Sequence, residues 1–186
     1  RFEINPGVLT PTSITDTNPD ITRFVSYLYQ FILSRKCDKA GLTDWVTQLS
    51  SHQSTAAHVV AGFIFSEEFE NKDLSNQDFV TILYKTILGR TPDTSGLNDW
   101  CSALEYGMSR NYVLKGFIES TEFSKLCDKY GIISGSITLS EARDQNRQTT
   151  KYVYICVQNC PSRNASINEL NTWTARLNNR TTSPGS

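Results

Sequence analysis

The chain has 186 residues, of which 38% are hydrophobic and 20% are charged, a composition typical of a globular protein. Its 18 Lys and Arg residues nearly balance 19 Asp and Glu residues, so the charge gives no reason to expect binding to nucleic acid. The longest unbroken apolar stretch, residues 59–65, is far shorter than the roughly 18 residues of a membrane span. We therefore expect no direct insertion into a membrane.

An internal repeat organises the sequence. Residues 24–49 return as residues 79–104 with 13 of 26 positions identical, and residues 59–69 return as residues 113–123. A weaker third copy begins at Tyr152. Its matches to the second copy include Arg163, Leu170 and Trp173, which correspond to Arg90, Leu97 and Trp100. Self-similarity at one spacing is the signature of stacked structural units, so each copy is treated as one unit.

Four helices are predicted within each full copy. From Phe24 onward, apolar residues recur in pairs at every fourth position, which is helical spacing and not the alternation of a strand. The first helix is expected to run from about Asp20 to Arg35, and its counterpart from about Ser75 to Arg90. The other helices are expected to begin at N-cap residues, which are Asp38, Ser54 and Ser66 in the first copy and Asp93, Ser109 and Ser120 in the second.

The predicted fold is all-α, with tandem compact helical units of about four helices each and an incomplete third unit. Residues 1–19 form an N-terminal linker, 20–74 the first repeat, 75–130 the second, 131–150 a linker with a short helix, and 151–186 a partial third repeat. The joint is placed at residues 131–139 because two glycines break the helical pattern there.

Two separated motifs carry a family resemblance. Leu88–Trp100 followed by Gly116–Phe123 resembles the repeat LGRxPDxxGLxxW and GFxxSxEF of a bacterial family of domains of unknown function. The first copy departs from this pattern at Ser34 and Cys37. The third copy departs further, at Pro161, Asn164, Ser166 and Glu169. A more distant similarity is to the phycobilisome linker domain, which has a related turn motif.

The resemblance implies a non-catalytic module of a secreted or cell-surface bacterial protein. It implies attachment to other domains of a larger parent chain. It supplies no ligand and no cofactor, so the partner must be inferred from the residues themselves.

The repeated motif residues are interpreted as structural. Arg35 with Asp44, and Arg90 with Asp99, are expected to lie close together, where each arginine forms an ion pair or caps backbone carbonyls and so fixes the turn between two helices. Trp45, Trp100 and Trp173 occupy one repeat position and are expected to lie in the core. The remaining positions assigned to the structural motif are Asp38, Gly41, Leu42, Phe63, Ser66, Phe69, Asp93, Gly96, Leu97, Phe117, Ser120, Phe123, Arg163 and Leu170.

Metal and catalytic sites find little support in the sequence. Asp38 with Asp44 could be read as calcium ligands, but the loop lacks the alternating oxygen ligands of an EF-hand. The five cysteines form no Cys-x-x-Cys pair, although Cys156 and Cys160 have the spacing for a bridge along a helix. No catalytic motif is recognised, so we predict no metal, no cofactor and no enzymatic activity.

Binding candidates are the aromatic residues that differ between copies, namely Tyr27, Phe31, Phe65, Tyr106 and Tyr112. The function predicted from them is an interaction module that binds a protein or a glycan at a cell surface. The alternative is a structural spacer or assembly domain with no ligand of its own. Self-association is a further prediction, because the apolar residues Val153, Ile155, Leu170, Trp173 and Leu177 must pack on the second unit or in a neighbouring chain.

Overall fold

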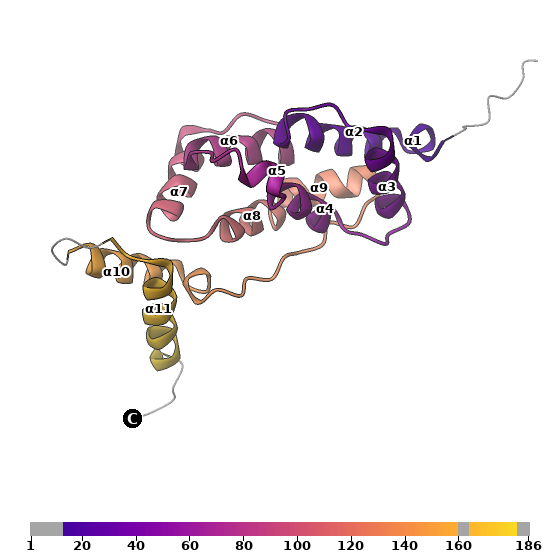
Figure 1. The fold of residues 1–186 in the computed structure, drawn as a ribbon. Helices are drawn as coiled ribbons and strands as arrows, with labels where there is room; N and C mark the ends of the chain where they lie inside the picture. The colour runs from indigo at the N-terminus through magenta and orange to yellow at the C-terminus, as the bar shows by residue number, and fades with distance from the viewer. Residues whose placement is uncertain (1–12, 160–163, 182–186) are drawn as a thin grey trace, which may run out of the picture.

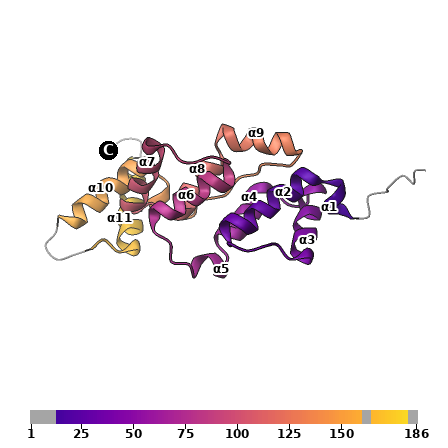
Figure 2. The same ribbon diagram turned by 90° about the horizontal axis from the view of Figure 1, so that it is seen from above.

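The computed structural model describes residues 13–159 and 164–181, and every regular element in them is helical, which confirms the all-α prediction. The short helix α1 (Ile14–Thr17) lies in the segment predicted to be a linker, and the four helices of the first repeat are α2 (Pro19–Tyr27), α3 (Lys39–Ser50), α4 (Ala56–Ile64) and α5 (Glu67–Glu70). The second contains α6 (Asn76–Ile87), α7 (Thr94–Glu105), α8 (Arg110–Ile118) and α9 (Thr121–Tyr130). The elements α10 (Arg147–Gln158) and α11 (Ile167–Thr181) follow, and Figure 2 shows the units in a row.

Side-chain caps start the second, third and fourth helices of each repeat. Asp38 accepts a hydrogen bond from the backbone N–H of Gly41 at 2.7 Å, and Asp93 accepts the equivalent bond from Gly96 at 2.8 Å. The third helix of the first repeat is capped by Thr55, and the prediction of Ser54 is wrong by one residue. The sequence loses one residue in the preceding loop of the second copy, so Thr55 is the structural counterpart of Ser109.

The first helix of each repeat ends three residues before the predicted arginine. In the first repeat a π-helical turn, Leu28–Ile32, extends α2, and in the second repeat α6 ends at Ile87. The chain then turns so that the backbone N–H of Arg90 reaches the carbonyl of Tyr84 at 3.3 Å. This turn needs a positive φ, which is 65° at Gly89 and 59° at Ser34, its counterpart.

The two full repeats share one hydrophobic core. A single cluster of buried side chains runs from Ile21 in α2 to Ile132 after α9. Contacts between the repeats include the rings of Phe69 and Phe79, whose centroids lie 6.4 Å apart, and those of Phe24 and Tyr130, at 6.2 Å. The compact units predicted from the sequence are therefore not independent in their packing.

The segment after α9 caps both third helices. It runs back along the two repeats in extended form, as the orange trace in Figure 1 shows. The carbonyls of Ile133 and Ser134 accept the backbone N–H groups of Ala56 and Ala57 at the start of α4, both at 2.8 Å. Helix N-termini leave their first N–H groups without partners in the helix, so these bonds complete α4.

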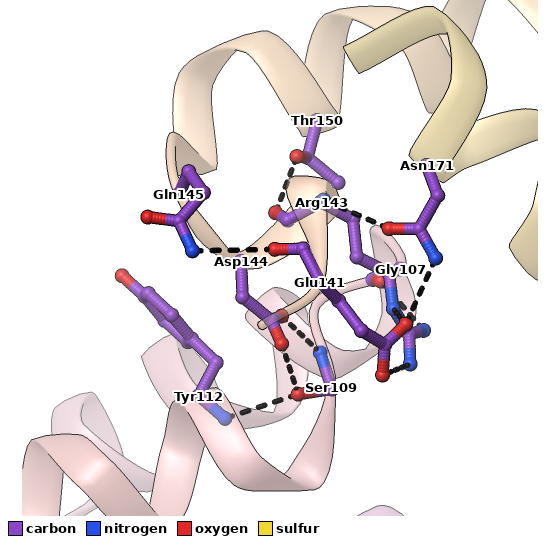
Figure 3. A network of polar contacts seen from close by, with 9 residues as sticks. All are labelled: Gly107, Ser109, Tyr112, Glu141, Arg143, Asp144, Gln145, Thr150 and Asn171. Atoms are coloured by element: carbon purple, nitrogen blue, oxygen red, sulfur yellow. Dashed lines mark hydrogen bonds and ion pairs between the residues drawn. The ribbon is translucent and has the colours of Figure 1, made fainter. Parts of the chain in front are cut away.

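The same segment completes α8 through a short 3₁₀ helix, Ala142–Asp144. The buried Asp144 carboxylate accepts the Ser109 backbone N–H at 2.8 Å and the Ser109 hydroxyl at 2.5 Å (Figure 3). Arg143 donates to the carbonyl of Gly107 at 3.0 Å and is held by Glu141, which also accepts from Asn171 of α11. This network attaches the partial third unit to the second repeat. Within the described ranges, no helix has the length and apolar character required to span a membrane.

Candidate functional site

Arg35 and Arg90 each connect the first helix of their repeat to the N-cap of the second helix and to the fourth helix. In the second repeat the Arg90 guanidinium lies over the Tyr84 ring at 4.8 Å, donates to Glu122 at 3.1 Å and lies 3.5 Å from Asp93. Arg35 makes the same set with Tyr29, Glu68 and Asp38 in the first repeat. The carboxylate of Glu122 or Glu68 raises the pKa of the arginine it pairs with, because it stabilises the charged form.

The predicted pairing of these arginines with Asp44 and Asp99 is wrong. Both aspartates are exposed, Asp44 on α3 and Asp99 on α7. Asp44 accepts the amide of Gln48 at 2.8 Å, and Asp99 pairs with Arg147 of α10 at 2.8 Å. The partners of the arginines are instead the glutamates of the SxEF motif, at one fixed position in each copy.

A close contact with a tyrosine explains why the motif has glycine before its leucine, at Gly41 and Gly96. A Cβ added at Gly41 would meet the hydroxyl of Tyr29, and a Cβ at Gly96 would meet that of Tyr84. Burial raises the pKa of both tyrosines because it disfavours the phenolate.

The tryptophans of the full repeats pack against the third helix. Trp100 lies against Gly116 and its ring centroid is 5.5 Å from that of Phe117, while Trp45 lies 6.1 Å from Phe63. Both indoles are half-buried beside the core. Trp173 differs, because 48% of it is exposed, and the expectation of a core position is wrong there.

The other motif residues also hold the fold. Ser66 and Ser120 cap the fourth helices. The side chains buried in or packed against the core are Leu42, Phe63, Phe69, Leu97, Phe117 and Phe123, and Leu170 is buried in the third unit. Arg163 and Pro161 lie outside the described residues.

No group of three or more His, Cys, Asp or Glu side chains is arranged for a metal in the part of the chain that the structure describes. Asp38, considered above as a calcium ligand, uses its carboxylate to cap α3. Burial raises the pKa of the Cys127 thiol to about 12, so this thiol stays protonated at neutral pH. Cys160 lies outside the described residues.

Two of the five aromatic binding candidates come together. Tyr27 and Phe31 are 43% and 38% exposed, and their rings meet edge to face with centroids 5.7 Å apart. They line a hollow of about 470 Å³ at the boundary between the repeats, together with Phe24, Gln30, Lys85, Thr86, Leu88, Gly89, Leu126 and Tyr130. We call this site the inter-repeat hollow.

Polar groups lie among the aromatic rings of the inter-repeat hollow. Thr86 is 5% exposed, and its hydroxyl has no hydrogen-bond partner among the described residues. Lys85 and Gln30 supply an ammonium and an amide at the same site. An apolar wall with a few polar groups is the usual composition of a ligand site.

The other three candidates lie elsewhere. Phe65 is partly buried against the core. Tyr112 is packed 6.4 Å from Trp100, and Tyr106 meets Tyr154 of α10 at 5.7 Å and the Lys151 ammonium at 4.4 Å. Tyr106 thus belongs to the contact between the second repeat and the third unit, and the five residues do not form one surface.

A second apolar site lies between α10 and α11. This groove has a volume of about 420 Å³ and is lined by Tyr152, Val153, Cys156, Val157, Glu169, Trp173 and Leu177. We call it the third-unit groove. Of the apolar residues predicted to pack on the second unit or in a neighbouring chain, Val153 and Leu170 are buried within the chain, and Leu170 lies against Gly107. Ile155 and Trp173 remain exposed.

One protein-family model matches this chain twice, in agreement with the two full repeats. The model of the family described as "Domain of unknown function (DUF4214)" matches residues 12–72 and again residues 61–127, together more than half of the chain. The chain belongs to the DUF4214 family. No curated protein and no solved structure matched this chain.

The two DUF4214 matches overlap at residues 61–72, together cover the two repeats that share the core, and both end before α10. Sequence reasoning missed two sets of residues in and after these repeats. Glu68 and Glu122 could have been found, because they recur at one repeat position and carry the charge that the arginines need. Asp144 could not, because its contact with Ser109 joins residues 35 positions apart that share no sequence pattern.

Proposed function

We propose that this DUF4214 protein is a non-catalytic interaction module of a secreted or cell-surface bacterial protein and that it binds a protein or glycan partner. The observation that carries the proposal is the inter-repeat hollow. Exposed aromatic rings lie there beside the polar residues Gln30 and Lys85, and the rings stand at positions that the repeat does not require. In the second copy, the counterparts of Tyr27 and Phe31 are Ile82 and Thr86.

The chemistry of the hollow favours a glycan as the ligand. Aromatic rings bury the apolar faces of sugars, and hydroxyl, amide and ammonium groups bond to sugar hydroxyls. Tyr27 and Phe31 supply the rings, and Gln30 and Lys85 are the polar residues that line the same hollow.

The use of the motif residues supports a non-catalytic role. The charged groups of the motif are engaged in caps and ion pairs of the fold, as with Arg90, Asp93 and Glu122. The assignment to a secreted or surface protein rests on the family resemblance of the two repeat motifs.

A glycan array with matched variants tests the proposal. The full chain should show saturable binding to one glycan class, and Tyr27→Ala or Phe31→Ala should weaken it about tenfold or more. Ile133→Ala is the control, because this side chain is 47% exposed and lies away from the hollow. Binding by all variants alike, or binding to no glycan and to no surface protein, would refute it.

A second candidate function is a structural spacer similar to the linker domains. The observation that favours it is the shared core, which joins two repeats into one elongated body (Figure 2). The same array separates a glycan-binding module from a spacer, because a correctly folded spacer shows no saturable binding to any glycan.

A further inference from the structure

The inter-repeat hollow carries a positive charge that none of its lining residues balances. Among those residues only Lys85 is charged at neutral pH, and aromatic and aliphatic side chains form most of the wall. The Lys85 side chain is exposed, and its ammonium has no ion pair or hydrogen bond among the described residues. The hydrogen-bond donors of this cation are therefore available to a ligand.

The charge of Lys85 is not needed for the packing of the repeats. Lys85 stands at the same repeat position as Gln30, and Gln158 stands there in the weaker third copy. Gln30 and Lys85 are both exposed, and both line the hollow. Since an uncharged amide occupies this position in the other copies, the ammonium adds charge to the hollow and no contact that the fold requires.

The charged groups beside Tyr130, in one wall of the hollow, leave the positive charge in excess. The Lys129 ammonium lies 5.9 Å from the centre of the Tyr130 ring. Burial and then the Asp20 carboxylate raise the pKa of Tyr130, while Arg23, which lies 3.8 Å from that carboxylate, opposes the increase. The Asp20 carboxylate is thus matched by a guanidinium and does not neutralise Lys85.

An ammonium beside aromatic rings matches a sugar that carries an anionic group. The rings of Tyr27 and Phe31, with centroids 5.7 Å apart, offer apolar surface to the ring of a sugar. The Lys85 ammonium has three N–H donors and the Gln30 amide has two. A carboxylate or a sulfate only accepts hydrogen bonds, and its bonds to an ammonium are stronger than those of a neutral hydroxyl.

We propose that the inter-repeat hollow binds an acidic glycan, whose sugar ring packs on Tyr27 and Phe31 and whose carboxylate or sulfate bonds to Lys85. The inference rests on the proposed function, because it names the class of ligand for the same site. It assigns separate tasks to the side chains. The aromatic rings bind the sugar whatever its charge, and Lys85 supplies the preference for the anion.

Paired glycans test the charge directly. The array presents uronic-acid glycans beside their methyl esters, and sulfated glycans beside their unsulfated forms. The full chain should bind one acidic glycan at least about fivefold more tightly than its uncharged partner. This preference should fall as salt is added, because salt screens exposed charges. The two kinds of pair show whether the anionic group is a carboxylate or a sulfate.

Protein variants assign the preference to one side chain. Lys85→Gln places the residue of the first repeat in the second, and it should remove the preference while both members of a pair still bind weakly. Lys85→Arg should retain most of the preference. Tyr27→Ala should weaken binding of both members alike. Lys39→Gln is the matched control, because Lys39 is exposed at the start of α3 and does not line the hollow.

The outcomes separate this inference from the proposed function. Saturable binding of a surface protein, or of glycans without regard to charge, would overturn the acidic ligand and leave the interaction module in place. A preference for acidic glycans that survives Lys85→Gln, or that Lys39→Gln removes equally, would also overturn it. Binding to no glycan and no surface protein would overturn both.

Discussion

The hydroxyl of Tyr84 lies directly against the α-carbon of Gly96, at the start of α7. Because Tyr84 is 5% exposed and packed in the shared core, its ring cannot move aside without disturbing Phe117. We expect Gly96→Ala to lower the free energy of unfolding by about 1 to 3 kcal/mol, the usual cost of overpacking. Urea unfolding of the chain and its variant measures the difference.

The control is the same substitution in a Tyr84→Phe background. Removal of the hydroxyl removes the clash, so Gly96→Ala should then cost much less, as a double-mutant cycle would show. An equal cost in both backgrounds would mean that the glycine serves backbone conformation and not this contact. The third unit already shows the linked change, with Val157 and Glu169 at the two positions.

The turn after the first helix is less favourable in the first repeat than in the second. Ser34 has a φ of 59° where the second repeat has Gly89 at 65°, and left-handed backbone costs non-glycine residues roughly 1 kcal/mol. Ser34→Gly should therefore stabilise the chain by somewhat less than about 1 kcal/mol. The gain is reduced because the Ser34 hydroxyl accepts a hydrogen bond from Lys72 at 2.9 Å.

Gly89→Ser is the matched opposite change for thermal unfolding. It should lower the melting temperature, and Ser34→Gly should raise it. Melting temperatures that move in the same direction for both variants would contradict this account of the turn.

The internal repeat predicts some contacts of the fold from the sequence and gives little indication of others. The register of Tyr84, Gly96 and Trp100 predicts helices and their packing, because local spacing sets which side chains share a helix face. The pairing of Arg90 with Glu122 joins residues 32 positions apart in sequence, and the only signal for it was that both residues recur in the first copy as Arg35 and Glu68. The inter-repeat hollow could be predicted only in part. Tyr27 and Phe31 were identified because they differ from the equivalent residues of the second copy, whereas nothing in the sequence pointed to Thr86.

Asp144 attaches the segment before the third unit to the second repeat through two hydrogen bonds from Ser109. Asp144→Ala leaves the buried Ser109 N–H and hydroxyl without this partner, which should cost about 1 to 3 kcal/mol. Hydrogen exchange should become faster at the start of α8 and in α10. Gln145→Ala is the control, because its side chain is exposed and donates to the carbonyl of Leu139. Equal effects of the two variants would count against a special role for Asp144.

The buried hydroxyl of Thr86 should lower the stability of the folded chain. Its hydroxyl is buried without a partner among the described residues, and Thr86→Val replaces it with an apolar group of the same shape. The variant should be more stable by up to about 1 to 2 kcal/mol. If the hydroxyl serves a ligand, its affinity should fall about fivefold or more in the glycan assay. A variant that loses stability would show that the hydroxyl has a partner in the folded chain.

Acid should loosen the contacts that attach the third unit to the second repeat. Arg147 holds the pKa of Asp99 below its ordinary value of 3.8, and Arg143 with Asn171 holds that of Glu141 below 4.5. A depressed pKa in the folded chain gives stability that is present above the unfolded value and is lost as the pH falls through the folded value. Hydrogen exchange in α10 and α11, corrected for intrinsic rates, should therefore accelerate from about pH 4.5 downward.

The variant Arg147→Gln tests the assignment of this acid response. It should weaken the contact of α10 at neutral pH and reduce the further change on acidification. An unchanged pH profile in this variant would place the response in other carboxylates.

The two bonds from Ile133 and Ser134 to the start of α4 have a consequence for synthesis of the chain on the ribosome. The first repeat emerges early, yet the carbonyl groups that complete its third helix are made only after all of the second repeat. The amino-terminal half must therefore wait in an unfinished state while translation continues. A nascent chain halted before Ile133 would present α4 with an open end, and a pause in translation at that point would prolong its exposure to chaperones and proteases.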